Sequence, residues 1–591
     1  MKKKKKSSLL LFLGVTLLLI NGGAAAYWFL VHKQPVLGLP PGANLIPQDA
    51  SLTLSVTTDS NQWQQLRSFG TPQTQAAFAK TLAQLRDRFL SSNGYNYQRD
   101  IQPWAGKEVT FAYLPTQQIN PTQPSSTLIP QTNNPSQQSV VMILPIDNPL
   151  QAKQALEPTN SPLQQGKWIS RTYKGIEIKE TKTGDALNIN STQYSATVLD
   201  RRFLVVTTNP KATERIIDTF QSSESLANVP GFKAAWEKIE TEQPFARLFI
   251  NVPVAIAAAK NSQPQLSNQN FAQIQQQGVA ATMSVKPEGL LFKSISWLQP
   301  NSDKKYAVKN ETGKMSIRLP ANTLMMMSGG NLQRFWQDYI QGAESNPLTP
   351  FKPEQIRSSV QKFTNLDLEK NLLSWMGGEF SLSLVPLPQE NSNSGENQPA
   401  APGLIFMVKA SDRAAAETTL QQLDQVMSNQ NKFKVEKTII GNKPVTNWIA
   451  PDRELTITQG WLDENVAFLA LGGVTNTILP QPKISLVQSD RFRNTVPLEL
   501  KSNNGHFYLD VESLGVDSTA RFLTFLFQLS TDPNTQKTLT NQLLPIRAIG
   551  VTAAVSDERS TRFDVFVSLK KAGVPKPLPS PTPERFSQPS L

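Results

Sequence analysis

The stretch Trp104-Ala105-Gly106-Lys107-Glu108 has a second copy in the same chain, Trp375-Met376-Gly377-Gly378-Glu379. Each copy leads directly into a short run, Val109–Leu114 or Phe380–Val385, and each run is followed by a proline. Apolar residues dominate both runs, which is typical of a β-strand that is bounded by turn residues. Because Trp, Gly, Glu and Pro recur in the same order 271 residues apart, the pair predicts a structural unit that occurs twice.

Five further pairs of short segments repeat in the same order, at separations of 260 to 273 residues. They are Pro47 and Trp63 with Pro320 and Trp336, Val140–Leu144 with Leu404–Val408, Phe203–Val206 with Val466–Leu469, Ser225-Leu226 with Ser485-Leu486, and Gly278–Ala281 with Gly550–Ala553. A period of this length indicates two similar domains rather than an array of short repeats. We therefore predict a tandem duplication.

The predicted fold class is α+β, with two similar tandem domains of mainly antiparallel sheet and packed helices. We place the repeat units at residues 43–300 and 314–570, joined by a polar linker at residues 301–313. Within each unit, strand patterns follow one another through hairpin turns, without the strand–helix–strand alternation of parallel sheets. Residues 571–591 contain six prolines and are predicted to be a disordered tail.

The N-terminus has the pattern of a membrane anchor. Residues 1–8 form a basic tail with Lys2–Lys6, and Leu9–Val31 follows without a charged residue. As a helix this stretch would extend about 35 Å, enough to span the core of a bilayer. The positive-inside rule predicts a cytoplasmic N-terminus and a body that is periplasmic or lumenal, beyond a Pro/Gly-rich spacer at residues 32–42.

A cleaved signal peptide is the alternative interpretation of this stretch. Its apolar region would be Leu9–Ile20, and Ala24-Ala25-Ala26 would be the cleavage site. The aromatic residues Tyr27, Trp28 and Phe29 favour the retained single-pass signal-anchor, because aromatic side chains gather at the membrane interface.

Composition excludes several classes of function. Residues 1–33 carry six lysines and no acid, so the rest of the chain has 52 basic against 46 acidic residues, a mild balance that does not indicate nucleic-acid binding. The chain has no cysteine, and therefore no disulfide, no thiolate nucleophile and no cysteine-ligated metal.

No catalytic constellation emerges from the sequence, and we predict a protein that is not an enzyme. His32 adjoins the predicted anchor, and His506 is expected to be a structural residue at a strand edge. Lys182-Thr183-Gly184 and Ser359–Lys362 match two elements of a penicillin-binding-type site, but they stand in the wrong order. We expect no catalytic residue, no cofactor and no metal site.

Two sets of repeated residues are candidates for a catalytic or ligand-binding site. Glu108 and Glu379 could suggest glycoside hydrolysis, but a turn or capping hydrogen bond is the favoured interpretation, because each lies in a different unit. Four repeated tryptophans could line a carbohydrate or lipid groove, although core packing is favoured: Trp63, Trp104, Trp336 and Trp375.

The chain resembles the DUF3352 family of uncharacterised cyanobacterial membrane-anchored proteins. The resemblance rests on the N-terminal anchor, the strand start at Pro47-Gln48-Asp49, the Trp-x-Gly-x-Glu turn and the hairpin at Leu199-Asp200. It implies an envelope or thylakoid setting and no known activity. We expect a non-enzymatic interaction or scaffold protein with protein partners there; the alternative is a binding module for an apolar ligand such as a lipid or pigment.

The anchor prediction is tested by N-terminal sequencing of the protein purified from membranes. A retained signal-anchor gives a sequence that begins ahead of Leu9, together with resistance to extraction from the membrane by carbonate. A sequence that begins at Tyr27 would show cleavage after Ala26 and refute the retained helix.

Overall fold

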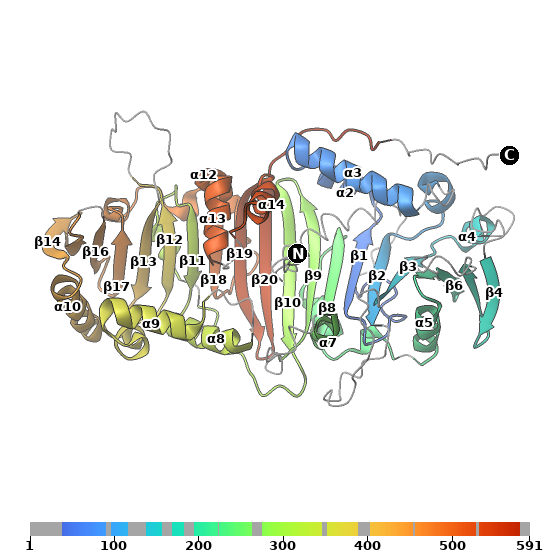
Figure 1. Ribbon diagram of the computed structural model, residues 1–591, viewed down its shortest axis with the longest axis horizontal. Coiled ribbons are helices and arrows are strands. Elements are labelled where there is room, and N and C mark those ends of the chain that lie inside the picture. The colour runs from blue at the N-terminus through green and yellow to red at the C-terminus, as the bar shows by residue number, and fades with distance from the viewer. Residues whose placement is uncertain are drawn as a thin grey trace, which may run out of the picture. The chain divides into compact units, whose positions relative to one another are not determined.

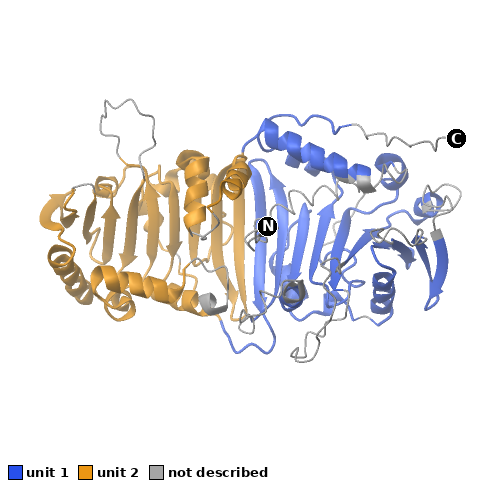
Figure 2. Ribbon diagram, viewed as in Figure 1, with its two compact units in different colours: residues 1–270, 275–305, 570–591 blue, residues 271–274, 306–569 orange. Residues whose placement is uncertain are grey.

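The computed structural model describes residues 38–89, 96–115, 138–156, 168–181, 194–222, 224–262, 275–311, 313–345, 351–387, 402–452, 455–526 and 531–579. The chain divides into two compact units (Figure 2): residues 1–270, 275–305 and 570–591 form unit 1, and residues 271–274 and 306–569 form unit 2. The predicted anchor, Leu9–Val31, lies outside the described residues. Within the described ranges, no helix combines the length and the apolar character needed to cross a bilayer.

Unit 1 contains an antiparallel sheet with the strand order β4-β5-β6-β7-β3-β2-β1-β8-β9-β10 (Figure 1). Its strands are β1 (Leu52–Thr57), β2 (Glu108–Pro115), β3 (Gln138–Pro145), β4 (Trp168–Tyr173), β5 (Ile176–Thr181), β6 (Ser195–Leu199), β7 (Phe203–Thr207), β8 (Ala246–Asn251), β9 (Gln276–Lys286) and β10 (Gly289–Leu298).

Unit 2 has the same strand order, β14-β15-β16-β17-β13-β12-β11-β18-β19-β20, and every pair is again antiparallel. Its strands are β11 (Met325–Gly329), β12 (Phe380–Val385), β13 (Gly403–Lys409), β14 (Lys434–Ile440), β15 (Lys443–Ile449), β16 (Thr456–Trp461), β17 (Val466–Leu471), β18 (Gly505–Asp510), β19 (Ile546–Asp557) and β20 (Ser560–Leu569). Antiparallel sheet with interspersed helices confirms the predicted α+β class.

Helices connect the strands of both units. Those of unit 1 are α2 (Ser60–Arg67), α3 (Pro72–Phe89), α4 (Pro149–Leu156), α5 (Pro210–Ser222), α6 (Phe232–Lys238) and α7 (Val252–Ser262). Those of unit 2 are α8 (Leu332–Ser345), α9 (Pro353–Thr364), α10 (Arg413–Asn429), α11 (Asp490–Thr495), α12 (Val511–Leu514), α13 (Val516–Leu526) and α14 (Pro533–Leu543). Proline begins α3, α4, α5, α9 and α14, where its missing N–H costs no hydrogen bond.

The core of each unit packs a helix against one face of the sheet through an aromatic pair. In unit 1, Phe232 of α6 meets Phe249 of β8 edge to face, with ring centroids 4.9 Å apart. In unit 2, Phe492 of α11 meets Tyr508 of β18 in the same manner at 5.2 Å. Such pairs add about 0.5–1.5 kcal/mol to the stabilisation from burial alone.

The strand pairing tests the repeated segments one by one. Pro47 bridges to Ser225 and Pro320 bridges to Ser485, so this predicted match occupies one position in both units. The match of Gly278–Ala281 with Gly550–Ala553 is displaced by two residues. Gly550 lies opposite Tyr508, and the residue opposite Phe249, which corresponds to Tyr508, is Ala280. The structural counterpart of Gly550 is therefore Ala280 and not Gly278. Small residues alternate along both strands, which made the two registers indistinguishable in sequence.

The predicted disordered tail differs from the structure over residues 571–579. These residues run alongside α2 and α3 (Figure 1) and are held by main-chain and side-chain hydrogen bonds. The Ala572 N–H donates to the Ser68 carbonyl at 3.1 Å, and Arg86 donates to the Pro579 carbonyl at 2.8 Å. Prolines lack only their own N–H, so their carbonyls remain available to arginine donors. Residues 580–591 lie outside the described residues.

Removing this segment should loosen the two helices that it contacts. We expect a chain that ends at Leu569 to exchange the amide hydrogens of α2 and α3 with deuterium faster than the full chain. A chain that ends at Pro579 retains every contact named above and serves as the control, with unchanged exchange. Mass spectrometry of the exchanged peptides distinguishes the two, and equal exchange in both truncations would contradict a stabilising role.

Candidate functional site

The four repeated tryptophans are part of the core. Their exposed fractions are 9% or less, which excludes a surface row for stacking sugars at these positions. The Trp63 indole N–H donates to the Thr57 carbonyl at 2.9 Å, and the Trp104 indole N–H donates to the Asp100 carbonyl at 2.8 Å. In both cases the indole fastens a helical turn to the residues beside it.

The two repeated glutamates have different partners. Glu108 forms a buried ion pair with Arg247 of β8. Glu379 accepts hydrogen bonds from the N–H groups of Lys314 and Met315, at 2.9 and 2.7 Å, at the start of the short helix Met315–Arg318. Burial raises the pKa of Glu379. The capping interpretation therefore applies to Glu379, whereas Glu108 is held by a cation.

His506 is the second residue of β18, which has β11 on one side and β19 on the other. The prediction of a strand-edge position was wrong, because β18 is paired on both sides. A polar side chain is tolerated there since it has a hydrogen-bond partner on the neighbouring strand β19. Its Nδ1 lies 3.1 Å from the Thr552 hydroxyl. Burial lowers the pKa of His506 to about 4. At neutral pH the ring is uncharged, and no carboxylate is bonded to it among the described residues.

The other sequence matches do not assemble. Ser359 and Lys362 lie exposed on α9, and Lys182-Thr183-Gly184 lies outside the described residues. Over the described ranges, no three histidine, aspartate or glutamate side chains gather in a way that could hold a metal ion.

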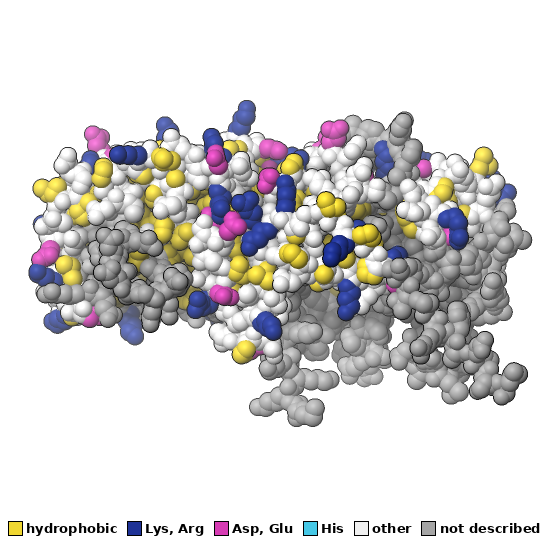
Figure 3. All heavy atoms as spheres, turned by 90° about the horizontal axis from the view of Figure 1, so that it is seen from above, with side chains coloured by type: hydrophobic (Ala, Val, Ile, Leu, Met, Phe, Trp, Pro, Cys, Tyr) yellow, Lys and Arg dark blue, Asp and Glu magenta, His cyan; other side chains and the backbone are white. Residues whose placement is uncertain are grey.

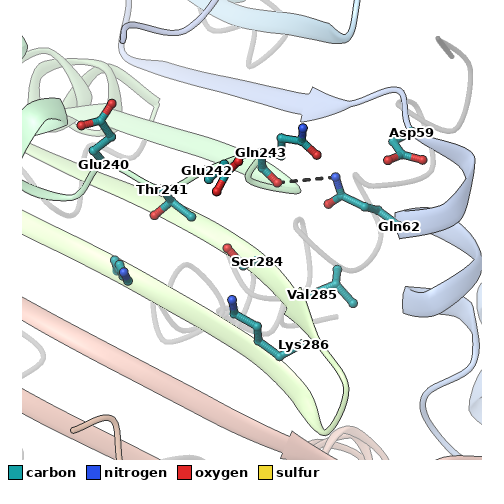
Figure 4. Close-up of a pocket in the computed structure, with 10 residues that line it drawn as sticks. Asp59, Gln62, Glu240, Thr241, Glu242, Gln243, Ser284, Val285 and Lys286 are labelled. Atoms are coloured by element: carbon teal, nitrogen blue, oxygen red, sulfur yellow. Dashed lines mark hydrogen bonds between the residues drawn. The ribbon is translucent and has the colours of Figure 1, made fainter. Parts of the chain in front are cut away.

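A polar hollow of about 480 Å³ opens at one end of the unit 1 sheet (Figure 4). We call it the unit 1 hollow. Side chains from the start of α2, the loop before β8, the end of β9 and β10 face it. The lining residues are Asp59, Gln62, Glu240, Thr241, Glu242, Gln243, Ser284, Val285, Lys286 and Lys293.

Local structure fixes two walls of the hollow. Asp59 caps α2 by accepting from the Asn61 N–H at 2.8 Å, and the Trp63 indole holds the same helix against the end of β1. Gln62 projects from that helix toward the loop, where its amide lies 3.5 Å from the Gln243 carbonyl (Figure 4), at the long limit of a hydrogen bond.

The floor of the hollow is an unpaired length of strand. The Phe245 N–H donates to the Met283 carbonyl at 2.7 Å, and β8 begins at Ala246, opposite Met283. Because backbone groups of alternate residues point to the same side of a strand, the N–H and C=O of Val285 also face the β8 side.

The chemistry of the lining suits hydrogen bonding to a polar chain. Three carboxylates, Asp59, Glu240 and Glu242, face two lysines, and no histidine or aromatic side chain contributes. The hollow therefore lacks the apolar wall that a lipid or pigment needs.

Sequence reasoning missed this hollow, and the only signal for it was the cap at Asp59. Its residues come from separate segments that carry no motif. Elsewhere on the surface, basic and acidic side chains are interspersed on the face shown in Figure 3 and form no one-sign stripe. This agrees with the mild charge balance of the chain.

Comparisons with known proteins identify a family whose function is unknown. Residues 11–569 match the family described as "Protein of unknown function (DUF3352)". No curated protein matches the sequence. Two solved structures of TP0453, crystal forms III and IV, align at 9% and 11% identity and a TM-score of 0.22 each, over 46% and 44% of this chain and 82% of theirs. At that score they support no conclusion about fold or function.

The lowered pKa of His506 predicts a loss of stability in acid. The folded-state pKa of about 4 is below the unfolded value of about 6.5, so this group's contribution is complete above pH 6.5 and is lost as the pH falls toward 4. We expect the loss to reach up to about 3 kcal/mol, at about 1.4 kcal/mol for each pKa unit.

The measurement is denaturant unfolding of the wild type and of His506→Gln at pH 7 and pH 4.5. The variant removes the titrating group and should lose less stability than the wild type between these pH values. An identical loss in both proteins would show that His506 does not titrate in this range.

Proposed function

The chain belongs to the DUF3352 family, whose function is unknown, and we propose that this member is a membrane-anchored, extracytoplasmic interaction protein without enzymatic activity. Its protein partners bind at the unit 1 hollow. The observation that carries the proposal is the unpaired end of β9, whose Val285 backbone groups open into a hollow lined by charged side chains. An exposed strand edge binds other polypeptides through main-chain hydrogen bonds, and the surrounding side chains provide specificity.

The location follows from the sequence of the N-terminus. Leu9–Val31 anchors the chain, with the lysine-rich tail in the cytoplasm and the body in the periplasm or thylakoid lumen. The family resemblance supports a cyanobacterial membrane.

The proposal includes a common origin for the two units. Both have the same strand order, and the bridge from Pro47 to Ser225 has its counterpart in the bridge from Pro320 to Ser485. A short helical turn also precedes both Trp104 and Trp375, with Asn96 capping the first turn and Asp367 the second. Caps, bridges and aromatic pairs at matching positions support a tandem duplication.

A photo-crosslinking experiment tests the interaction. A photoreactive residue in place of Lys286, which is exposed in the hollow, should crosslink to a discrete polypeptide in native membranes. The matched control replaces Lys233, which is exposed on α6 of the same unit and does not line the hollow. Adding Glu242→Lys to the Lys286 variant should abolish the product, because it reverses one charge of the lining.

Two results would contradict the proposal. One is a product of equal yield from both positions, which indicates random encounters. The other is a Lys286 variant that crosslinks only to lipid, identified by mass spectrometry, which would favour the apolar-ligand alternative.

A further inference from the structure

In unit 2 the place that corresponds to the unit 1 hollow is filled by the chain itself. Residues 306–311 run across the ends of the strands before the chain enters β11. The side chain of Asn310 donates to the Val555 carbonyl and accepts from the Val555 N–H, each at 2.9 Å. The Tyr306 N–H donates to the Glu558 carbonyl at 2.8 Å. A side-chain amide here satisfies both backbone groups of a strand residue.

Val555 and Val285 occupy the same position in their units. The last pair of β18 with β19 is Gly505 with Ala553, and the last pair of β8 with β9 is Ala246 with Met283. Each valine therefore lies two residues beyond its last pair, with its backbone groups turned to the side where the neighbouring strand has ended. In unit 2 Asn310 supplies the missing partners, whereas in unit 1 the same groups open into the hollow.

A helix supplies a second matching feature. Arg334, three residues after the α8 cap Asn331, donates to the Lys309 carbonyl at 3.0 Å and so holds the linker in place. Gln62 stands three residues after the α2 cap Asp59 and lines the hollow. Its amide lies on the wall of the hollow and can donate to a peptide carbonyl there.

The chain's own sequence does not provide the same occupant for unit 1. The matched prolines, Pro47 and Pro320, are 273 residues apart, so the sequence position that corresponds to Asn310 is Leu37, which lies outside the described residues. Leucine has no amide and cannot form the two bonds that Asn310 makes with Val555.

We propose that the unit 1 hollow binds an extended segment of a partner protein, with an asparagine side chain on the backbone of Val285 and a main-chain carbonyl on Gln62. The inference deepens the proposed function and rests on it. The lining carries three carboxylates against two lysines, so a lysine beside the asparagine, as in Lys309-Asn310, complements the charge. The partner is a peptide strand rather than a folded face, because the unpaired edge extends only over Ser284–Lys286.

The probe is a fluorescent synthetic peptide that copies residues 304–312, and binding to the full-length protein in detergent is measured by anisotropy. We expect saturable binding that weakens about tenfold or more for a peptide carrying Asn310→Leu, because two hydrogen bonds are lost. Gln62→Leu in the protein should weaken binding several-fold. The control is Gln64→Leu, an exposed residue of the same helix that does not line the hollow, and it should have no effect.

Three results would overturn the inference. Equal affinity for the native and Asn310→Leu peptides would show that asparagine is not recognised. An affinity that is unchanged in the Gln62→Leu protein would show that the peptide binds elsewhere, for example in unit 2 after displacement of the linker. Binding that appears only after residues 33–37 are replaced by glycine and serine would show that the chain fills its own hollow.

The crosslinking and peptide-binding experiments distinguish a failure of this inference from a failure of the proposed function. If the photoreactive residue at position 286 captures a protein but the peptide does not bind, the hollow is an interaction site of another specificity and this inference alone is wrong. If the crosslink is also absent, the proposed function is wrong as well.

Discussion

A buried or partly buried backbone N–H or C=O group needs a partner, and in both units a strand outruns its neighbour and leaves such groups without one. β9 extends past the start of β8, and β19 extends past the start of β18. In both units the strands are paired in the same register up to that point. In unit 2 the deficit explains why the linker is ordered: Asn310 lies across β19 because Val555 offers it one donor and one acceptor. In unit 1 the same register creates a floor that is open to a ligand. One feature of strand pairing thus gives a structural contact in one unit and a candidate site in the other.

At matching positions the two units have similar apolar residues, whereas the polar residues differ together with their partners. Phe232 with Phe249 and Phe492 with Tyr508 retain one packing geometry. The second residue of the eighth strand in the order is Arg247 in β8 but His506 in β18. A buried Arg247 needs a carboxylate, which Glu108 supplies, because an unpaired buried charge would cost several kcal/mol. His506 stays neutral since burial lowers its pKa to about 4, and it needs no counter-ion. Glu379 is then free to cap the helix at Met315.

The sequence predicts the α+β class and many strand positions well but the site poorly, for physical reasons. Strand starts such as Glu108 and Phe380 are marked by Trp-x-Gly-x-Glu turns, and turn residues are a local signal. The register of β19 is not local: alternating small residues fit two registers, and the cross-strand contacts with β18 select one. The tail at residues 571–579 was predicted from its prolines alone, which say nothing about the arginines of α2 and α3 that hold it. The hollow follows from where β8 begins relative to the end of β9, a property that no single segment encodes.

The difference between the hollows follows from chain order. A covalently attached segment binds at an effective concentration in the millimolar range, so the linker that leads into β11 can occupy its groove through a few hydrogen bonds. The partner proposed for unit 1 lacks this advantage and has to recover the same free energy from further contacts. The charged side chains around Val285 are suited to supply them, since Glu240, Glu242 and Lys286 are exposed beside the strand edge. In unit 2 the counterpart of Val285 is already capped by the chain. The same strand end is thus capped by the chain in unit 2 and faces the hollow in unit 1, which is why the proposed interaction site lies in unit 1.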